Sequence, residues 1–340
     1  MHDVALHVDG QIYGGWESVT VSRSIEQVSG SFDISHTDKW ADQRTPRPIK
    51  RGAVCRLSID GVNVISGYVS EIVPTYNSDS HEISVSGDAK TVDLADCSAV
   101  DKQYNGQDLT QIATDICKPF GIKVTADTDV GEPFDRFEVE SETAFDAIER
   151  AARQRGILLI SDAQGDLVLT KRSTEKMPVT LELGKNIREA SGLFSDRDRY
   201  SDYLVAGQTV GTDEFNGTQA ATPKAAIKDA GIKRYRPLRI DAEQQGAGES
   251  LKKRAQWERN VRAGRGTRIT YTVYGWYAGS KLWEPNRLVR VQDPFFGIDG
   301  DLLVSGCTYV IDDQGVHCDV ELTLPQAFDL LPIPEDGGSF

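Results

Sequence analysis

The sequence predicts a mainly β protein with an α+β unit in its middle. Strand patterns with alternating apolar residues and Asp-Gly turns fill the first hundred residues, helical patterns follow, and strand patterns return in the last third. Short antiparallel strands at regular spacing are typical of small barrels and sandwiches. We therefore expect two similar small antiparallel β-barrel domains on either side of a middle α/β unit.

The first barrel domain is expected over residues 1–98. Its strands alternate apolar and polar residues in "VALHVDG" and "VCRLSIDG", and each run ends at Asp-Gly, the strongest short-range hairpin signal. The stretch "HEISVSG" supplies a further strand near the end of this domain.

The middle α+β domain is expected over residues 99–175. In "GQDLTQIATDICKPFGI" the apolar residues recur on one helical face, and Pro119 and Gly121 end the pattern. A second helix is predicted in "SETAFDAIERAARQRG", with a stop at Gly156. The stretch "ILLISDAQGDLVLT" then predicts a hairpin that turns at Gln164-Gly165.

The second barrel domain is expected over residues 176–325, followed by a C-terminal tail, 326–340. Residues 171–182 read as a linker around Pro178, and residues 207–233, rich in Thr, Ala and Gly, as an exposed insertion. A weakly apolar helix is expected at about 249–264. The tail is rich in Pro and Gly and is expected to be partly disordered.

Composition limits the class of protein. The 340 residues contain neither a signal-peptide pattern nor an apolar run long enough to span a bilayer, which predicts a soluble protein made in the cytoplasm. The five cysteines are scattered and form no CxxC, so neither a disulfide framework nor a zinc site is expected. They read as small buried hydrophobes, and no cofactor or metal is indicated.

Charge is unevenly distributed along the chain. The total is −14, but residues 181–265 hold 16 basic and 12 acidic residues, a net charge of +4 that leaves −18 on the rest. Within this region Lys233, Arg234 and Arg236 surround Tyr235, the mixture found in nucleic-acid patches. In so acidic a chain, pairing with acidic surfaces of the same or a neighbouring subunit is the favoured interpretation, and these four residues are interface candidates.

Four aromatic residues in the last third flank Gly and Pro turns. Trp276, Trp283, Phe295 and Phe296 suit either a barrel core or a subunit interface. They complete the set of candidate interface residues.

Catalytic motifs are weak throughout. Asp93, Asp96 and Cys97 lie within five residues, which could serve an activated thiol, but no base or metal partner is near in sequence. We interpret this stretch as a structural corner. "GAGESLKKR" departs from known phosphate-loop spacings, and paired carboxylates such as Asp135 and Glu138 lack flanking sugar-binding residues. No catalytic residue is assigned, and the protein is expected not to be an enzyme.

The two β-rich ends echo each other. "VCRLSIDG", "ISGYVSEIV" and "HEISVSG" recur as "LVRVQDPFFGIDG", "VSGCTYVI" and "HCDVELT", which aligns Ser66-Gly67 with Ser305-Gly306 and His81 with His317. If the domains are duplicated, three chains in a ring would present six similar domains, so that a trimer could face a sixfold partner.

The whole chain resembles the baseplate hub proteins of Mu-like contractile-tail phages, related in fold to the central hub of the T-even phages. The resemblance rests on segments in order along nearly the entire chain: "GGWESVTVSRSIEQVSGSFDIS", "IDGVNVISGYVSEIVPTYNSDSHEISVSGDAKTVDLADCSA", "LTQIATDICKPFGI", "AFDAIERAARQRGILLISDAQGDLVLT", "YRPLRIDAE", "RAQWERNVRAGR" and "LWEPNRLVRVQDPFFGI". It is loosest at 207–233 and in the tail.

The resemblance implies a structural virion protein of the tail baseplate, assembled in the bacterial host cytoplasm. It implies a homotrimeric ring with pseudo-sixfold symmetry that joins the tail tube, or a tube-initiator protein, to the central spike and contacts other baseplate proteins. Three chains would carry a charge of −42, and an acidic channel wall would let DNA pass without specific binding. Alternatives are a hub-like component of a contractile secretion or bacteriocin apparatus and, ranked lower, a tail-associated cell-wall hydrolase.

Overall fold

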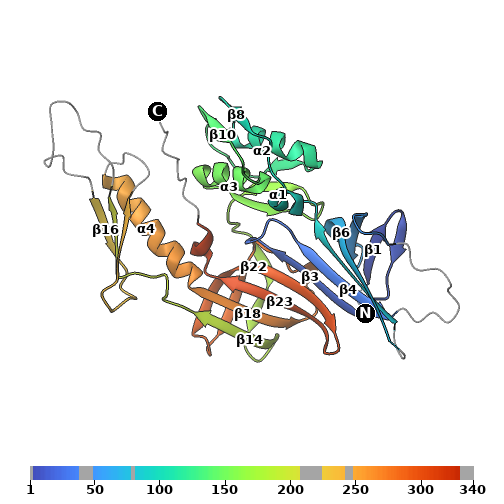
Figure 1. The fold of residues 1–340 in the computed structure, drawn as a ribbon. Helices are drawn as coiled ribbons and strands as arrows, with labels where there is room; N and C mark the ends of the chain where they lie inside the picture. The colour runs from blue at the N-terminus through green and yellow to red at the C-terminus, as the bar shows by residue number, and fades with distance from the viewer. Residues whose placement is uncertain (1–2, 38–48, 78–80, 207–223, 242–247, 330–340) are drawn as a thin grey trace, which may run out of the picture.

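The computed structural model describes residues 3–37, 49–77, 81–206, 224–241 and 248–329 (Figure 1). Within these residues, no helix is long and apolar enough to cross a membrane.

Strands from the N-terminal third form one half of a large sheet. Its hairpin turns have the positive backbone φ angles that Asp-Gly turns require, at Asp9 and Asp60 (both φ 49°) and at the glycines that follow them. The strands are β1 (Val4–Val8), β2 (Gln11–Tyr13), β3 (Ser18–Ser24), β4 (Ser31–Thr37), β5 (Val54–Ile59), β6 (Val62–Tyr76) and β7 (His81–Ala89).

Strands from the C-terminal half form the other part of this sheet. They are β13 (Lys176–Glu182), β14 (Ile187–Phe194), β18 (Thr267–Tyr274), β21 (Leu288–Asp293), β22 (Ile298–Asp312) and β23 (Gly315–Thr323). A separate small hairpin is made by β19 (Tyr277–Ala278) and β20 (Lys281–Leu282). The interpretation of 171–182 as a linker was wrong, because β13 pairs in parallel with β21 and Leu181 is buried.

The two halves are joined edge to edge, which corrects the prediction of two barrels. The strand order is β14-β18-β23-β22-β3-β4-β7-β6-β5-β1-β2, with β13 and β21 branching from β22, and the sheet does not close on itself. Alternation and turns predict strands and hairpins, but closure depends on which distant strands pair. Here β3 of the first half pairs with β22 of the second half and does not close a barrel (Figure 1).

The middle unit packs on its own core. Its elements are α1 (Val92–Asp96), β8 (Lys102–Tyr104), α2 (Leu109–Cys117), a 3-10 turn (Lys118–Phe120), β9 (Val124–Ala126), β10 (Phe137–Val139), α3 (Ala144–Arg155), β11 (Leu158–Ser161) and β12 (Leu167–Thr170). Both predicted helices and the hairpin through Gln164-Gly165 are confirmed. The predicted inward face of α2 is buried.

A small three-stranded sheet and a long helix form one end of the molecule (Figure 1). The strands are β15 (Asp202–Ala206), β16 (Lys224–Lys228) and β17 (Pro237–Asp241), and the helix is α4 (Gly248–Arg265), close to the predicted 249–264. Tyr203 and Val205 pack against Leu251 and Ala255 of the helix. Part of the predicted insertion, 224–228, is therefore a paired strand, and its residues 207–223 lie outside the described residues.

The main core of the large sheet is drawn from both ends of the chain. One cluster of buried apolar residues includes Leu6 and Val21 from the first half and Tyr271, Trp276 and Tyr309 from the second. The chain then ends its described part in a 3-10 turn (Pro325–Phe328), whose Ala327 and Phe328 are buried. This turn lies in the predicted tail, and residues 330–340 are outside the described part.

Candidate functional site

The two halves of the sheet repeat one strand arrangement. In β5–β6–β7 and in β21–β22–β23 the middle strand has 15 residues. Val69 of β6 exchanges hydrogen bonds with segment 52–53, and Val304 of β22 does the same with segment 286–287. The register with the third strand shifts directly after each valine, at Ser70 and at Ser305. These shared features make Val69 and Val304 equivalent.

This equivalence confirms the echo as a repeat of strand arrangement but corrects its alignment. Ser305 matches Ser70, whereas the alignment of the sequence patterns pairs it with Ser66. In the third strands, His317 lies opposite Val310 and matches Glu82, which lies opposite Thr75, so its pairing with His81 was also wrong. Short strand patterns with one glycine align equally well at several offsets, and only the bulges fix the correct one.

The junction between the halves is an antiparallel pair of β3 with the second half of β22. The register runs from Val19 opposite Ile311 to Ser24 opposite Gly306. The Ser22 and Thr308 hydroxyl oxygens lie 3.0 Å apart on one face, and the Ile25 N–H donates to the Ser305 carbonyl at 2.8 Å. The two halves are thus one continuous surface.

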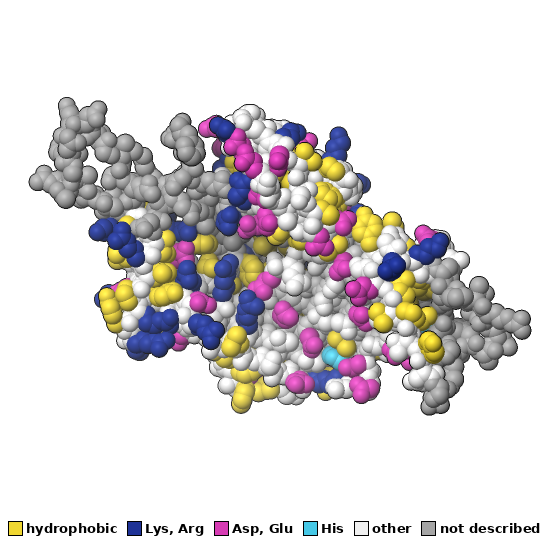
Figure 2. Space-filling model, in the orientation of Figure 1, with side chains coloured by type: hydrophobic (Ala, Val, Ile, Leu, Met, Phe, Trp, Pro, Cys, Tyr) yellow, Lys and Arg dark blue, Asp and Glu magenta, His cyan; other side chains and the backbone are white. Residues whose placement is uncertain are grey.

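One face of this continuous sheet consists mainly of hydroxyl and carboxylate side chains. Neighbouring strands exchange hydrogen bonds on it: the Ser84 hydroxyl donates to Asp33, the Ser70 hydroxyl to Asp88, and the Thr272 hydroxyl to Asp319 at 2.6 Å. Figure 2 shows this sheet region mostly white and magenta, whereas Lys and Arg gather over the β16 and α4 end. Burial and neighbouring acidic groups, Glu26 and Asp319, raise the pKa of Glu321 on this face.

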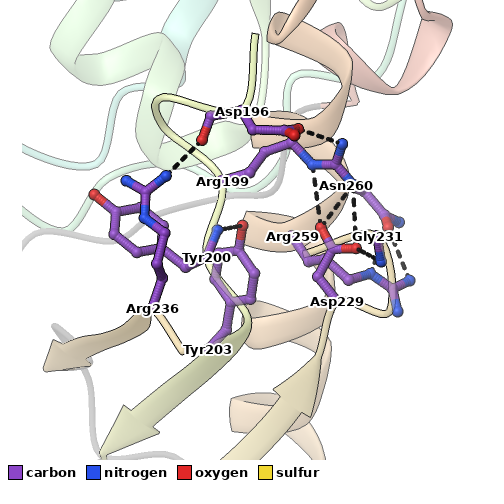
Figure 3. Close-up of polar contacts among 9 residues, drawn as sticks. All are labelled: Asp196, Arg199, Tyr200, Tyr203, Asp229, Gly231, Arg236, Arg259 and Asn260. Atoms are coloured by element: carbon purple, nitrogen blue, oxygen red, sulfur yellow. Dashed lines mark hydrogen bonds and ion pairs between the residues drawn. The ribbon is translucent and has the colours of Figure 1, made fainter. Parts of the chain in front are cut away.

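The basic segment predicted as an interface lies in the connection from β16 to β17, at the small-sheet end. Lys233, Arg234 and Tyr235 are exposed, Tyr235 to 84%. Arg236 is tied to its own chain, because its guanidinium donates to the carbonyls of Asp196 and Arg197 and lies over the Tyr200 ring (Figure 3). Three of the four residues are therefore available to a partner.

An ion pair between half-buried Arg199 and buried Asp229 holds this segment in place. The Arg199 guanidinium donates to both carboxylate oxygens of Asp229 at 3.0–3.2 Å and to Asp196 at 2.8 Å (Figure 3). The Asp229 carboxylate also accepts from the Gly231 N–H at 2.9 Å, which shapes the turn that leads to Lys233. Burial lowers and the two carboxylates raise the pKa of Arg199, with a net upward shift.

The aromatic candidates separate into two groups. Trp276 and Trp283 are buried in the core of the large sheet. Of the two interpretations that the sequence left open, core or interface, both tryptophans are therefore core residues within this chain. Phe296 packs against that core, with its ring 5.6 Å from that of Phe194, and Phe295 is 82% exposed beside it.

Asp293 fixes the turn that exposes Phe295. Its Oδ1 accepts from the Phe295 N–H at 2.9 Å and the Phe296 N–H at 3.2 Å, and its Oδ2 accepts from the Tyr271 hydroxyl at 2.9 Å. Burial, with a contribution from Asp293, raises the pKa of Tyr271 above its usual range. The position of Phe295 is thus set by a buried polar contact.

Exposed apolar side chains on two strands were missed from the sequence. Leu193 and Phe194 on β14 are 60% and 54% exposed, and Val73 on β6 is 51% exposed. The sequence does carry a signal for this exposure, because two neighbouring apolar residues in a strand point to opposite faces of the sheet.

The residues weighed for catalysis lie in the middle unit, on or beside α1 and β10. Cys97 is exposed and follows α1, and burial raises the pKa of Asp93 with a smaller effect of Asp96. The Glu138 carboxylate pairs with Arg136. No cluster of three or more His, Cys, Asp or Glu that could hold a metal occurs within the described part of the chain.

Three family models match the chain in succession. They are the Mu phage baseplate assembly protein GpP-like N-terminal domain at residues 3–89, the second domain of gp44-like baseplate hub proteins at 91–171, and the fourth domain of Mu phage GpP at 247–331. The baseplate hub protein gp44 of Escherichia phage Mu is 33% identical over 347 residues, covering 98% of this chain and 90% of that protein. The chain belongs to the Mu-like phage baseplate hub family.

A solved relative agrees with this assignment. The hub chain is 41% identical to the 43 kDa tail protein of prophage MuSo2 from Shewanella oneidensis, with a TM-score of 0.86, covering 97% of this chain and all of that one. A component of the E. coli type VI secretion system shares the fold, with a TM-score of 0.62 at 12% identity over 97% of this chain and 80% of that one. The hub chain is accordingly a baseplate hub protein of a Mu-like phage tail and a component of the virion tail.

Proposed function

We propose that this hub protein acts as a homotrimeric ring with pseudo-sixfold symmetry between the tail tube and the central spike. The observation that carries the proposal is the continuous sheet, in which two halves with one strand arrangement are joined edge to edge. Three such chains supply six similar halves, and a closed ring of three can face a sixfold tube through near-equivalent surfaces.

The hydroxyl and carboxylate face of the sheet is the channel wall in this proposal. Its side chains hydrogen-bond to one another, as Ser84 does to Asp33 and Thr272 to Asp319. Carboxylates repel phosphates, and the Arg268 side chain on this face is paired with Glu26, so a wall of this kind attracts DNA only weakly. DNA therefore passes during ejection without being held. The protein needs no catalytic residue for this role, and we assign none.

The small-sheet end supplies a second contact surface. Exposed Lys233, Arg234 and Tyr235 suit an acidic surface of a neighbouring baseplate protein, the spike or the tube, including a tube-initiator protein. Assembly takes place in the host cytoplasm in this proposal. The same fold in a secretion-system component leaves a hub of a secretion or bacteriocin apparatus as the second candidate, which shares the ring and differs in what passes through it.

The solution mass of the purified protein tests the ring. Light scattering on a sizing column at low and moderate salt is expected to give three chains of 37.4 kDa each. Addition of the spike protein from the same tail to a monomeric preparation is the matched second measurement. A chain that stays monomeric under both conditions would refute the trimer.

A further inference from the structure

The repeat within the chain contains a template for the contact between chains. We propose that the outer edge of β14 pairs antiparallel with residues 71–75 of β6 in a second copy, in the register that β3 and β22 show within one chain. This inference rests on the ring proposed above and specifies its interface.

The first step is that β14 occupies the place of β3 in the repeat. In the first half, β4 lies between β7 and β3, and in the second half β18 lies between β23 and β14. Ile34 of β4 and Tyr271 of β18 are equivalent, since they face the matching residues Val85 and Val320. Val19 lies opposite Ile34 and Ala190 opposite Tyr271, so β3 and β14 correspond residue by residue.

The second step concerns the two edges left over. In the described chain, β3 pairs on both sides, with β4 and β22, whereas β14 pairs only with β18. Likewise, the second half of β22 pairs with β23 and β3, whereas the matching residues 71–75 of β6 pair only with β7. A strand edge with unpaired backbone groups is a template for pairing with another chain. Each half of the internal junction therefore has a counterpart that lacks its partner.

The third step transfers the register. Ser22 lies opposite Thr308 in the internal junction, and these residues correspond to Leu193 and Val73. The same correspondence sets Phe194 opposite Ile72, Gly192 opposite Pro74 and Ser191 opposite Thr75. In an antiparallel pairing, the two residue numbers of every facing pair add up to the same total, and this total defines the register. A slip of one residue changes the total, so pairs of cysteines placed in and out of register can detect it.

The side chains fit this register. The register brings together two exposed apolar side chains, Leu193 and Val73. They take the places that Ser22 and Thr308 occupy in the internal junction. Phe194 meets Ile72, and an open groove beside β6, walled by Ser70, Ile72 and Pro74 and by segment 49–52, gives room for the incoming strand. Burial of these apolar side chains away from water stabilises such a contact.

The proline in β6 agrees with an edge that is bonded on one side. Alternate residues of β22 from Ser305 onward bond toward β3, since Ser305 accepts from Ile25 and antiparallel bonds alternate. Pro74 matches Tyr309, one of these alternate residues. The backbone N–H that proline lacks would therefore point to the outer edge of β6, and no hydrogen bond between β6 and β7 is lost. The junction has one hydrogen bond fewer at this point, opposite Gly192.

Disulfide trapping tests the register directly. Val73 and Leu193 form a non-hydrogen-bonded pair, whose Cα atoms lie about 4.5 Å apart in antiparallel sheets, within the range that disulfides span. In a Cys97→Ser background, mild oxidation of V73C/L193C is expected to shift the denatured band from one chain to three. T75C/S191C is expected to behave alike. Mixed V73C and L193C single variants are expected to give dimers only.

The out-of-register variant V73C/S191C is the matched control, and it is expected to remain largely uncrosslinked. A protein of trimeric mass in which this control crosslinks as fast as V73C/L193C, or in which neither pair crosslinks, would overturn the register and leave the ring standing. A protein of monomeric mass with and without the spike would overturn the ring itself, so the two failures are distinguishable.

Discussion

At the scale of single residues, burial controls the chemistry of the cysteines. Cys55, Cys117, Cys307 and Cys318 are buried and Cys97 is exposed. Burial raises the pKa of Cys55 and of Cys117 to about 12 and that of Cys307 to about 11, from 9.0. These thiols stay protonated in the fold, as expected for small apolar core residues.

The raised thiol pKa values predict alkaline destabilisation. Each buried thiol contributes stability that is fully present below about pH 9 and is lost as the pH rises toward the folded pKa, because the unfolded chain releases the proton first. Between pH 9 and 11, we expect Cys117→Ala to make the fall in unfolding free energy shallower by up to about 1.4 kcal/mol per pH unit. Urea unfolding at several pH values measures this slope.

Cys97→Ala is the matched control, because the side chain it removes is exposed. Its slope is expected to equal that of the parent protein. Equal slopes for Cys117→Ala and the parent would contradict a raised pKa for Cys117.

The residues of the candidate surfaces were only partly predictable. Lys233, Arg234 and Tyr235 were found because a basic and aromatic cluster stands out in an acidic chain. The tryptophans could not be assigned, since an aromatic residue beside a turn suits a core and an interface equally. Leu193 and Val73 were missed because their exposure depends on which strands lie at the edge of the sheet, a property of the tertiary pairing.

At the scale of elements, local signals were sufficient where an element is stabilised by its own sequence. In α2, the Asp108 side chain accepts from the Gln111 N–H at 2.8 Å and the Gln111 side chain accepts from the Asp108 N–H at 3.0 Å. This capping box, together with the apolar face, marks the helix in the sequence.

The capping box of α2 predicts a measurable loss of stability. Asp108→Ala removes the acceptor for the Gln111 N–H and is expected to lower the unfolding free energy by about 1 kcal/mol in urea titrations. Asp108→Asn keeps a capping oxygen and should lose much less. If both variants lost the same amount, the capping bond would not be the cause.

The small sheet and strand β13 show what local signals miss, whereas helix α4 is predicted close to its observed bounds. Helix α4 has little apolar periodicity because Glu258, which is mostly buried, is held by Arg254 and Arg262, each at 3.0 Å. Strand β13 was masked by Pro178 and by the polar residues around it. This strand pairs with β21, which lies far away in sequence and outside any window of a few residues.

At the scale of the whole molecule, charge is divided by location. Basic residues gather at the small-sheet end, and the large sheet presents hydroxyls and carboxylates (Figure 2). The sequence predicted this asymmetry and the class of fold. It did not predict that the two β units share one sheet, because pairing between β3 and β22 joins residues 286 positions apart.

The proposed channel wall predicts that the protein does not retain double-stranded DNA at moderate salt. A variant with Asp33→Lys, Asp88→Lys and Asp319→Lys is expected to retain it in a gel mobility assay, with an affinity that falls steeply as salt is added. Reversal of the same number of charges at Asp96, Asp129 and Asp135 on the middle unit is the control for total charge. Retention of DNA by the unaltered protein would contradict a non-binding wall.

The seam between β3 and β22 also has a consequence for biosynthesis. Strand β3 leaves the ribosome long before the residues that it pairs with, 306–311, have been made. Until then β3 presents an unpaired edge, and contacts so distant along the chain form slowly. We expect nascent chains truncated before residue 298 to aggregate, and the yield of soluble protein to depend on chaperones that shield this strand during translation.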